Sequence, residues 1–349
     1  MKIAIDGMGG DNAPQEIVKG CVEAARMIDD EIYIVGVEDA IRKELKNYIS
    51  IPGNIKIVNA TQVITGEDQP VKAVRAKKDS SLIKAISLVR EGICDAVISA
   101  GNTGALMAGS LFILGRIKGI ERPAIGTSYP QADGSPTFLV DAGANAECKP
   151  SQLVQFATMG SIYMEKVIGV ENPSVGLINI GTEEHKGTPV LKETYQLLKE
   201  SNINFCGNIE ARDIPYHPAD VFVCDGFTGN NILKLTEGMA QRYMALLKDM
   251  FKSNVVTKMS AVAMMGKLKE LKELMDYSEY GAAPLLGIKG VVLKMHGSSK
   301  SNAVKNAIIK GRKYVEENVV GIIDQNVAKY GLENAAKQDD KADAANKGA

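Results

Sequence analysis

Five glycine-rich turns, each directly after a short apolar run, carry the residues whose chemistry stands out in this sequence. They read IDGMGGDN, SAGNTGA, DAGAN, NIGTEEHKG and CDGFTGN, at residues 5–12, 99–105, 141–145, 179–187 and 224–230. Glycines let backbone N–H groups approach a ligand closely, and the N-terminus of a following helix favours an anion. The set therefore predicts a backbone-built anion site, best suited to phosphate.

The glycines and small polar side chains of these turns are the candidate ligands of that anion. Lys186 is the only lysine or arginine in the five turns, so it is a candidate for phosphate contact, and His185 is a candidate acid or base. Asn102 and Asn230 complete the expected catalytic set. The expected substrate- and phosphate-binding residues are Asp6, Gly9, Gly10, Asp11, Asn12, Ser99, Gly101, Thr103, Gly104, Asp141, Gly143, Asn145, Asn179, Gly181, Thr182, Asp225, Gly226, Thr228 and Gly229.

A structural role is the alternative for several of these residues. Asp6, Asp141 and Asp225 each end a strand-like run just before a glycine, so each either caps its own turn or takes part in the reaction. Asp11 is either a helix cap or a ligand for substrate or metal. For the loop residues Lys186 and His185, the alternative is a solvated side chain.

Absent motifs narrow the chemistry. No Gly-Lys-Ser/Thr follows any of the glycines, and the first turn lacks the third glycine of a dinucleotide fingerprint, which disfavours a P-loop and a standard NAD site. There is no Gly-x-Ser-x-Gly elbow, no Cys/His nucleophile pair, and no metal-ligand spacing among the five cysteines and three histidines. Inorganic phosphate is itself an anionic nucleophile, so an enzyme that uses it needs only to orient it and to stabilise the developing oxyanion.

The elements that position these turns alternate between strand and helix, which predicts a mostly parallel sheet with ligands beyond the carboxyl ends of its strands. The pattern predicts strands at residues 3–5, 32–37, 55–58, 96–99, 124–128, 137–140, 175–180, 221–224 and 291–295. It predicts helices at about 14–28, 80–92, 104–117, 151–168, 189–199, 230–251 and 301–319.

Composition bounds the class of protein. With 349 residues, 45% hydrophobic and 24% charged, the chain has the make-up of an ordinary globular protein, and its net charge of −1 gives no reason to expect a nucleic-acid partner. We expect no signal peptide, because the charged Lys2 leads directly into a strand and a glycine-rich turn. No apolar run is long enough to span a membrane, and the scattered cysteines fit a reducing cytoplasm. We expect one α/β domain over residues 1–333 and a disordered polar tail over 334–349.

Residues 253–287 break the alternation. The segment reads as one or two amphipathic helices followed by a loop at 280–287, with an apolar stripe flanked by lysines. One interpretation is a packed helix or a subunit interface, and the other is a surface that touches lipid or an acyl chain. The expected membrane-contact residues are Val255, Met259, Val262 and Met265.

Six blocks of this sequence resemble the PlsX family of acyl-carrier-protein:phosphate acyltransferases, in the same order over about residues 1–320. They are IAIDGMGGDNAP, AVRAKKDSS, SAGNTGA, DAGAN, NIGTEEHKG and CDGFTGN. The resemblance implies that phosphate attacks the thioester of a long-chain acyl-ACP, giving acyl phosphate and holo-ACP for phospholipid synthesis. The acyl phosphate then feeds a membrane glycerol-3-phosphate acyltransferase.

The same resemblance implies the architecture and the partners. It implies a three-layer αβα, Rossmann-like sandwich similar to isocitrate and isopropylmalate dehydrogenases, a homodimer, and a cytoplasmic protein bound peripherally to the inner face of the membrane. It implies no metal and no organic cofactor. Two alternatives stay open: a phosphate acetyl- or butyryltransferase acting on a CoA thioester, and a non-catalytic membrane docking protein.

Because ACP is strongly acidic, a local basic patch must attract it although the net charge is near zero. Two clusters are candidates: Lys72, Arg75, Lys77 and Lys78, and the group Lys267, Lys269 and Lys272.

Overall fold

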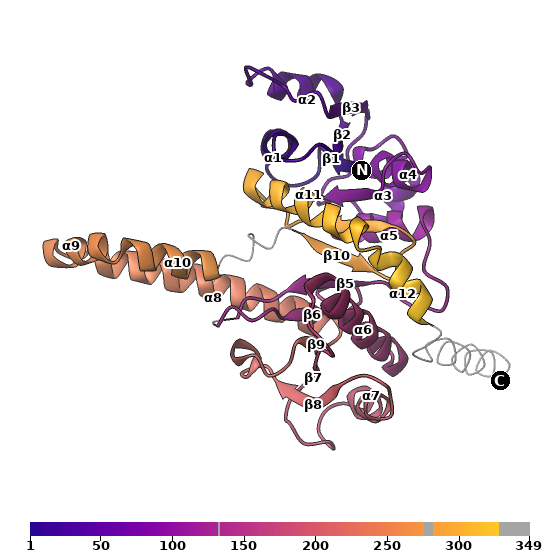
Figure 1. The fold of residues 1–349 in the computed structure, drawn as a ribbon, viewed down its shortest axis with the longest axis vertical. Helices are drawn as coiled ribbons and strands as arrows, with labels where there is room; N and C mark the ends of the chain where they lie inside the picture. Colours follow the sequence, from indigo (N-terminus) through magenta and orange to yellow (C-terminus); the bar gives the residue numbers. More distant parts are fainter. Residues whose placement is uncertain (132, 276–281, 328–349) are drawn as a thin grey trace.

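The computed structural model describes residues 1–131, 133–275 and 282–327. Its described part is built on one eleven-stranded sheet in the order β3-β2-β1-β4-β11-β10-β5-β6-β9-β7-β8 (Figure 1). The strands are β1 Lys2–Asp6, β2 Glu31–Gly36, β3 Ile55–Asn59, β4 Ala96–Ser99, β5 Ala124–Ser128, β6 Phe138–Val140, β7 Val175–Asn179, β8 Phe205–Glu210, β9 Val221–Val223, β10 Ala283–Leu286 and β11 Val291–Lys294.

The sheet consists of two parallel groups that run in opposite directions. Strands β3, β2, β1, β4 and β11 form one group, and β6, β9, β7 and β8 form the other. Between them, β10 pairs antiparallel with β11 and β5, and β5 pairs antiparallel with β6. Because these central strands are only three to five residues long, the carboxyl ends of the two groups come close together at the middle of the sheet.

Helices cover both faces of the sheet, as the alternation of buried strand residues requires. In β1, Ile3 and Ile5 pack into a core with helices α1, α2 and α11, whereas Ala4 between them packs toward α4 and α5 on the other face. The helices are α1 Gln15–Ala25, α2 Glu38–Leu45, α3 Pro70–Ala76, α4 Ser81–Arg90, α5 Thr103–Ile113, α6 Pro150–Tyr163, α7 Pro189–Lys199, α8 Gly226–Lys252, α9 Val255–Ala263, α10 Met265–Met275, α11 Ser301–Glu316 and α12 Val319–Val327.

The nine predicted strands are present, but several elements differ from the prediction. The predicted loop at 280–287 contains β10, which pairs with two neighbours although Pro284 lies within it. Helix α8 begins at Gly226 rather than at about 230, because the Asp225 carboxylate accepts the Thr228 N–H at 2.7 Å and caps it. Strand β8 and helices α2, α3 and α12 had not been predicted.

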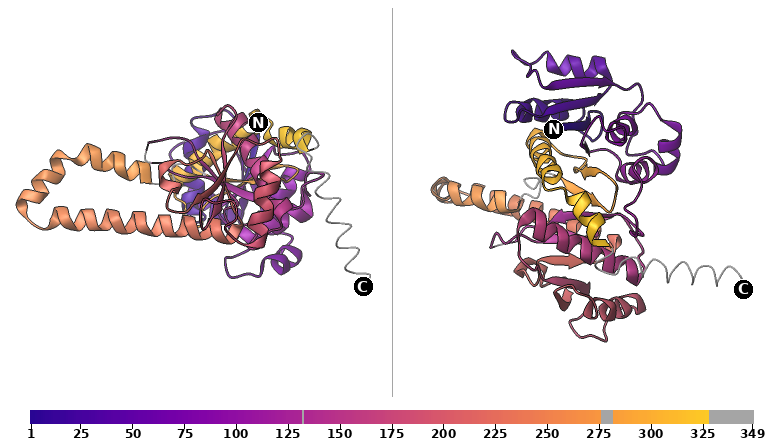
Figure 2. Two further views of the ribbon diagram at one scale, coloured as in Figure 1. Left: turned by 90° about the horizontal axis from the view of Figure 1, so that it is seen from below. Right: turned by 45° about the vertical axis from the view of Figure 1, so that its right-hand side comes forward.

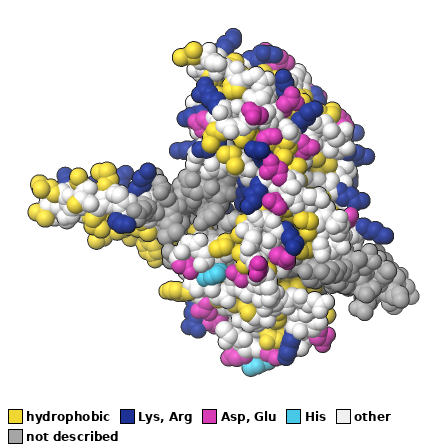
Figure 3. Space-filling view, in the orientation of Figure 1, with side chains coloured by type: hydrophobic (Ala, Val, Ile, Leu, Met, Phe, Trp, Pro, Cys, Tyr) yellow, Lys and Arg dark blue, Asp and Glu magenta, His cyan; other side chains and the backbone are white. Residues whose placement is uncertain are grey.

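Helices α8, α9 and α10 form an arm that projects from the body (Figure 2). Along α9, none of the residues is buried, and the side chains of Val255, Met259, Val262 and Met265 are each at least 61% exposed. The apolar stripe predicted at this position is therefore uncovered in the single chain, and apolar and basic side chains lie together on the arm (Figure 3).

None of the described helices combines the length and the apolar content needed to cross a bilayer. The predicted tail at 334–349 lies outside the described residues.

Candidate functional site

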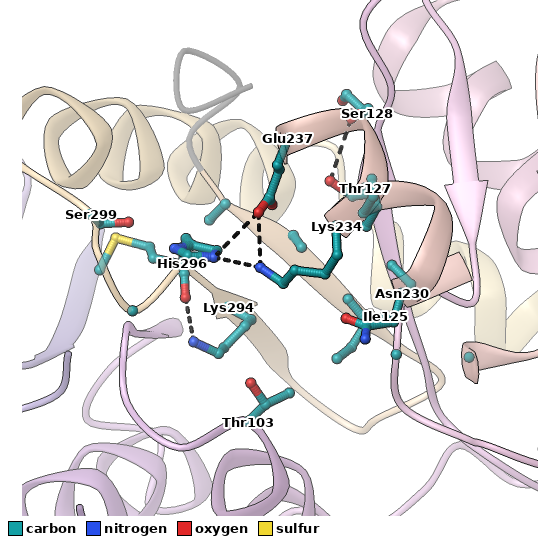
Figure 4. A pocket seen from close by; sticks show the side chains of 18 of the residues that line it. Thr103, Ile125, Thr127, Ser128, Asn230, Lys234, Glu237, Lys294, His296 and Ser299 are labelled. Carbon is teal, nitrogen blue, oxygen red and sulfur yellow. Dashed lines mark hydrogen bonds and ion pairs between the residues drawn. The ribbon is translucent and has the colours of Figure 1, made fainter. Parts of the chain in front are cut away.

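A cavity of about 510 Å³ lies at the middle of the sheet, where the carboxyl ends of the two strand groups meet (Figure 4). Strand β5 forms one wall with Ile125, Thr127 and Ser128, and α8 forms another with Asn230, Leu233, Lys234 and Glu237. The turns after β4, β6, β9 and β11 contribute Thr103, Ala142, Gly143, Gly226, Phe227, His296, Gly297 and Ser299.

Three ionisable side chains point toward one another in this cavity. Lys234 Nζ lies 2.9 Å from Glu237 Oε2 and 2.9 Å from His296 Nε2. Because an ammonium only donates hydrogen bonds, His296 Nε2 accepts in this contact. On the other side of the ring, Nδ1 lies 2.7 Å from Ser298 Oγ and 3.2 Å from the backbone nitrogen of Ser298. Burial and the Lys234 charge lower the pKa of His296, which agrees with a neutral ring.

Lys294, at the end of β11, connects this cavity to a second one of about 470 Å³. Both cavities are lined by Thr103, Lys294 and Gly297, and the second also by Gly10 and Asp11. Burial lowers the pKa of Lys294 to about 8, although Asp6 and Asp11 attract its charge and so oppose the shift. A partly buried ammonium near two helix N-termini is suited to binding an anion.

Asp6 lies beneath the second cavity and supports it. Its Oδ2 accepts a hydrogen bond from Ser99 Oγ at 2.7 Å, and Ser99 Oγ in turn accepts the Gly101 N–H at 3.0 Å. A Cβ on Gly9 would stand 2.4 Å from Asp6 Oδ2, so this turn requires a glycine. Burial raises the pKa of Asp6, while the Ser99 hydrogen bond and the Lys294 charge oppose that rise.

Asp141 organises the turn after β6. Its carboxylate accepts backbone N–H groups of Ile125, Gly143, Ala144 and Asn145 at 2.7–3.1 Å, and the Asn145 side chain at 2.9 Å. These bonds occupy both carboxylate oxygens, so Asp141 holds Gly143 and Ala142 at the cavity wall. Of the two roles open from the sequence, its geometry is that of the structural one.

Two helices direct their N-termini at the cavities. Asn102 Oδ1 accepts the Ala105 N–H at 3.0 Å and caps α5, while its amide nitrogen donates to the carbonyls of Thr65, Gly66 and Asp68. The first N–H groups of α5, near Thr103 and Gly104, have no acceptor within the helix and face the second cavity. The N-terminus of α8 reaches the first cavity with Gly226 and Phe227.

Close backbone contacts fix α8 against the turn after β6. Gly226 N–H donates to Asn145 O at 2.7 Å, and a Cβ on Gly229 would lie 2.0 Å from Asp141 O. Only glycine fits at both positions, and their packing places Asn230 beside Gly143. A side-chain contact joins two other turns: the Asn12 amide donates to Ser298 O at 3.0 Å and so links the first turn to the turn after β11.

The remaining predicted turn, after β7, contributes no residue to the lining of either cavity. Asn179, Gly181, Thr182, His185 and Lys186 line neither cavity. His185 is exposed, and the turn is closed on itself by a hydrogen bond from Asn179 Nδ2 to Lys186 O at 3.2 Å. Four of the five predicted turns thus meet at the two cavities, and a role for Lys186 and His185 stays a prediction.

Sequence reasoning missed Lys234, Glu237, Lys294 and His296. The turn after β11, HGSSK, has one glycine, so glycine content does not single it out as it does the five other turns, although it also links a buried strand to a helix. Lys234 and Glu237 lie inside a long helix, where no local pattern separates them from solvated residues. In the described part of the chain, no cluster of three or more His, Cys, Asp or Glu side chains could hold a metal ion.

Comparison with known proteins agrees with the phosphate-type site. Residues 1–321 match the model of a family described as "Fatty acid synthesis protein". The chain is 48% identical over 340 residues to the phosphate acyltransferase of Clostridioides difficile (strain 630), covering 97% of this chain and 100% of that protein. It is 52% identical over 331 residues to the phosphate acyltransferase of Alkaliphilus oremlandii, covering 95% and 98%.

The fold also has a solved counterpart. A phosphotransacetylase from Streptococcus pyogenes superposes with a TM-score of 0.60 at 16% identity, covering 90% of this chain and 94% of that one, which shows likeness of fold alone. The family match and the two near-full-length relatives go further than the fold. The chain is therefore an acyltransferase that belongs to the fatty acid synthesis protein family, the PlsX family of phosphate acyltransferases.

Proposed function

We propose that this enzyme transfers a long-chain fatty acyl group from an acyl-ACP thioester to inorganic phosphate, giving acyl phosphate and holo-ACP. The observation that carries the proposal is the composition of the cavity between the strand groups. Lys234, Lys294 and two helix N-termini provide positive potential for a phosphate dianion, while Ile125, Leu233 and Ala282 provide an apolar wall for an acyl chain.

The reaction needs no covalent enzyme intermediate. A phosphate oxygen attacks the thioester carbon, the carbonyl oxygen gains negative charge, and the tetrahedral intermediate collapses as the C–S bond breaks. Lys294 and the α5 N–H groups are suited to hold phosphate at the second cavity, and Lys234 faces the first cavity, where the carbonyl would lie. The departing thiolate takes a proton from the Lys234 ammonium or from water, and His296 keeps that ammonium in place.

Incubation of purified enzyme with phosphate and palmitoyl-ACP tests this function. We expect phosphate-dependent release of the ACP thiol and a stoichiometric amount of acyl phosphate, trapped with hydroxylamine, without added metal or nucleotide. Activity on acetyl-CoA or butyryl-CoA with none on palmitoyl-ACP would assign the enzyme to the short-chain CoA class instead. Activity abolished by a chelator and restored by a divalent metal would refute the cofactor-free mechanism.

We infer further that the enzyme acts as a homodimer at the cytoplasmic face of the membrane, where a glycerol-3-phosphate acyltransferase consumes its product. The exposed apolar stripe of α9 and the nearby Lys258 support membrane contact, since apolar burial and attraction to anionic headgroups add. Delivery at the bilayer shortens the exposure of a reactive, lipophilic acyl phosphate to water.

We also infer that the fold belongs to the three-layer αβα subclass of the isocitrate and isopropylmalate dehydrogenases. Two oppositely directed parallel groups, joined by short central strands with a cavity between them, support that assignment.

A further inference from the structure

A groove of about 560 Å³ lies between α3, α4 and α5, apart from the two cavities already described. Its floor is apolar, with the buried side chains of Val74 and Ile83 and the partly exposed Ile113. Phe112 stands at its edge with 52% of its side chain exposed. An aromatic ring this exposed beside an apolar floor is a common feature of protein-binding surfaces.

Basic side chains surround this floor. Arg75, Lys78 and Arg90 line the groove and are exposed, with Glu91 as the one acidic residue that lines it. The Arg75 guanidinium lies 5.6 Å from the centre of the Phe112 ring, and Arg90 donates to Ile113 O at 2.9 Å. Among the described residues, none of the three cations forms an ion pair with a carboxylate, so their charge is available to a partner.

Lys77, unlike Arg75 and Lys78, forms an ion pair with a carboxylate of its own chain. Its Nζ lies 2.6 Å from Asp68 Oδ2 and 2.9 Å from Val63 O, on the side of the 63–68 loop. Its charge is therefore used within the fold. Of the basic cluster at 72–78, Arg75 and Lys78 are the members that line the groove.

We propose that this groove docks the acidic, amphipathic helical surface of the carrier protein that bears the acyl group. Carboxylates of the carrier would pair with Arg75, Lys78 and Arg90, and an apolar residue between them would pack on Phe112. This inference rests on the proposed function, because it names the docking site for the acyl donor of that reaction.

The position of the groove fits delivery to the active site. Helix α5 begins at Thr103, which lines both cavities, and ends at Ile113, which lines the groove. The two sites are thus separated by ten residues of one helix, about 15 Å. A carrier docked at Phe112 holds its thioester on a flexible prosthetic arm, which then has to reach along α5 to its N-terminal end.

The experiment compares three variants with wild type: the double variant Arg75→Glu/Lys78→Glu, the variant Phe112→Ala, and the control Lys43→Glu/Lys46→Glu. The control makes the same charge change on the exposed Lys43 of α2 and the exposed Lys46 directly after it, and α2 packs on the opposite face of the sheet. Binding of holo-ACP by titration and steady-state kinetics with palmitoyl-ACP are measured at low and high salt.

For the groove double variant we expect the holo-ACP dissociation constant and the KM for palmitoyl-ACP to rise about tenfold or more, with kcat within about twofold and a weaker salt dependence. Phe112→Ala should weaken binding without changing the salt dependence, and the control should match wild type. Wild-type affinity in both groove variants, or an equal loss in the control, would overturn the proposal. If wild-type enzyme neither binds holo-ACP nor uses palmitoyl-ACP, the proposed function itself is wrong.

Discussion

The charge of Lys294 should control phosphate binding, and its titration makes that testable. The pKa of this partly buried lysine is lowered to about 8 by desolvation, with Asp6 and Asp11 attracting its charge and Lys234 repelling it. Below its pKa the ammonium is intact, and it is lost as the pH rises through that value. From about pH 8 to about pH 10 the protonated fraction falls from about one half to about 1%. Phosphate stays a dianion over this range.

If only the protonated form binds phosphate, kcat/KM for phosphate falls about 50-fold over that interval. Lys294→Met should be impaired at pH 8 and approach wild type at pH 10, because both side chains are then neutral. Lys294→Arg keeps its charge and should lack the inflection. The assay is thiol release at saturating acyl-ACP, with circular dichroism at each pH as the folding control. A flat wild-type profile, or the wild-type inflection in the Arg variant, would refute the reasoning.

Three further predictions follow from the site and the arm. Lys234→Ala should lower kcat by about 10²-fold, as expected when an oxyanion-stabilising donor is lost. Lys186→Ala should lower kcat by less than about tenfold, because the Lys186 side chain lines neither cavity; the reverse order in a steady-state assay would mean that the turn after β7 takes part in the reaction. Ser99→Ala removes the hydroxyl that donates to the buried Asp6 carboxylate and accepts the Gly101 N–H, and should cost about 1–3 kcal/mol in urea unfolding, a loss that an unchanged midpoint would contradict. Val262→Asp/Met265→Asp should abolish co-sedimentation with anionic vesicles while soluble activity persists; active variants that still sediment would exclude this segment as the membrane contact.

Nine strands and the glycine-rich turns after five of them were predictable because their signals are local. The run Ile3–Ile5 is continuously apolar and is followed by glycines, so it reads as a buried strand with a turn at its end. Strand β10 has no such signal, since Pro284 lies within it and Gly287 follows directly after its four residues. It exists because β11 and β5 offer it two partners, which is a tertiary effect.

The backbone turns that form the candidate site were predicted from the sequence, whereas its charged side chains, Lys234 and Lys294 among them, were not. The glycine turns around Thr103 and Gly143 were found because their function depends on backbone conformation, which glycine spacing reports. Lys234 reaches the cavity only because α8 lines it, and Lys294 is desolvated there only because β11 lies between β4 and β10. Which lysine is desolvated depends on packing between distant segments, and no window of sequence contains that information.

The length of α8 gives the enzyme a mechanical property. The helix begins in the cavity, where Asn230 and Lys234 lie on its first turns, and continues without interruption for 27 residues, about 40 Å, to Lys252 (Figure 1). A rigid helix of this length that rotates about its N-terminal end, at the active site, moves its far end much more than its first turns. Rotating its axis by about 5° at the root displaces the far end by about 3.5 Å, several times the movement of Asn230 itself. The same geometry works in reverse, so fixing the far end of the arm restrains the orientation of the first turn of α8 in the cavity.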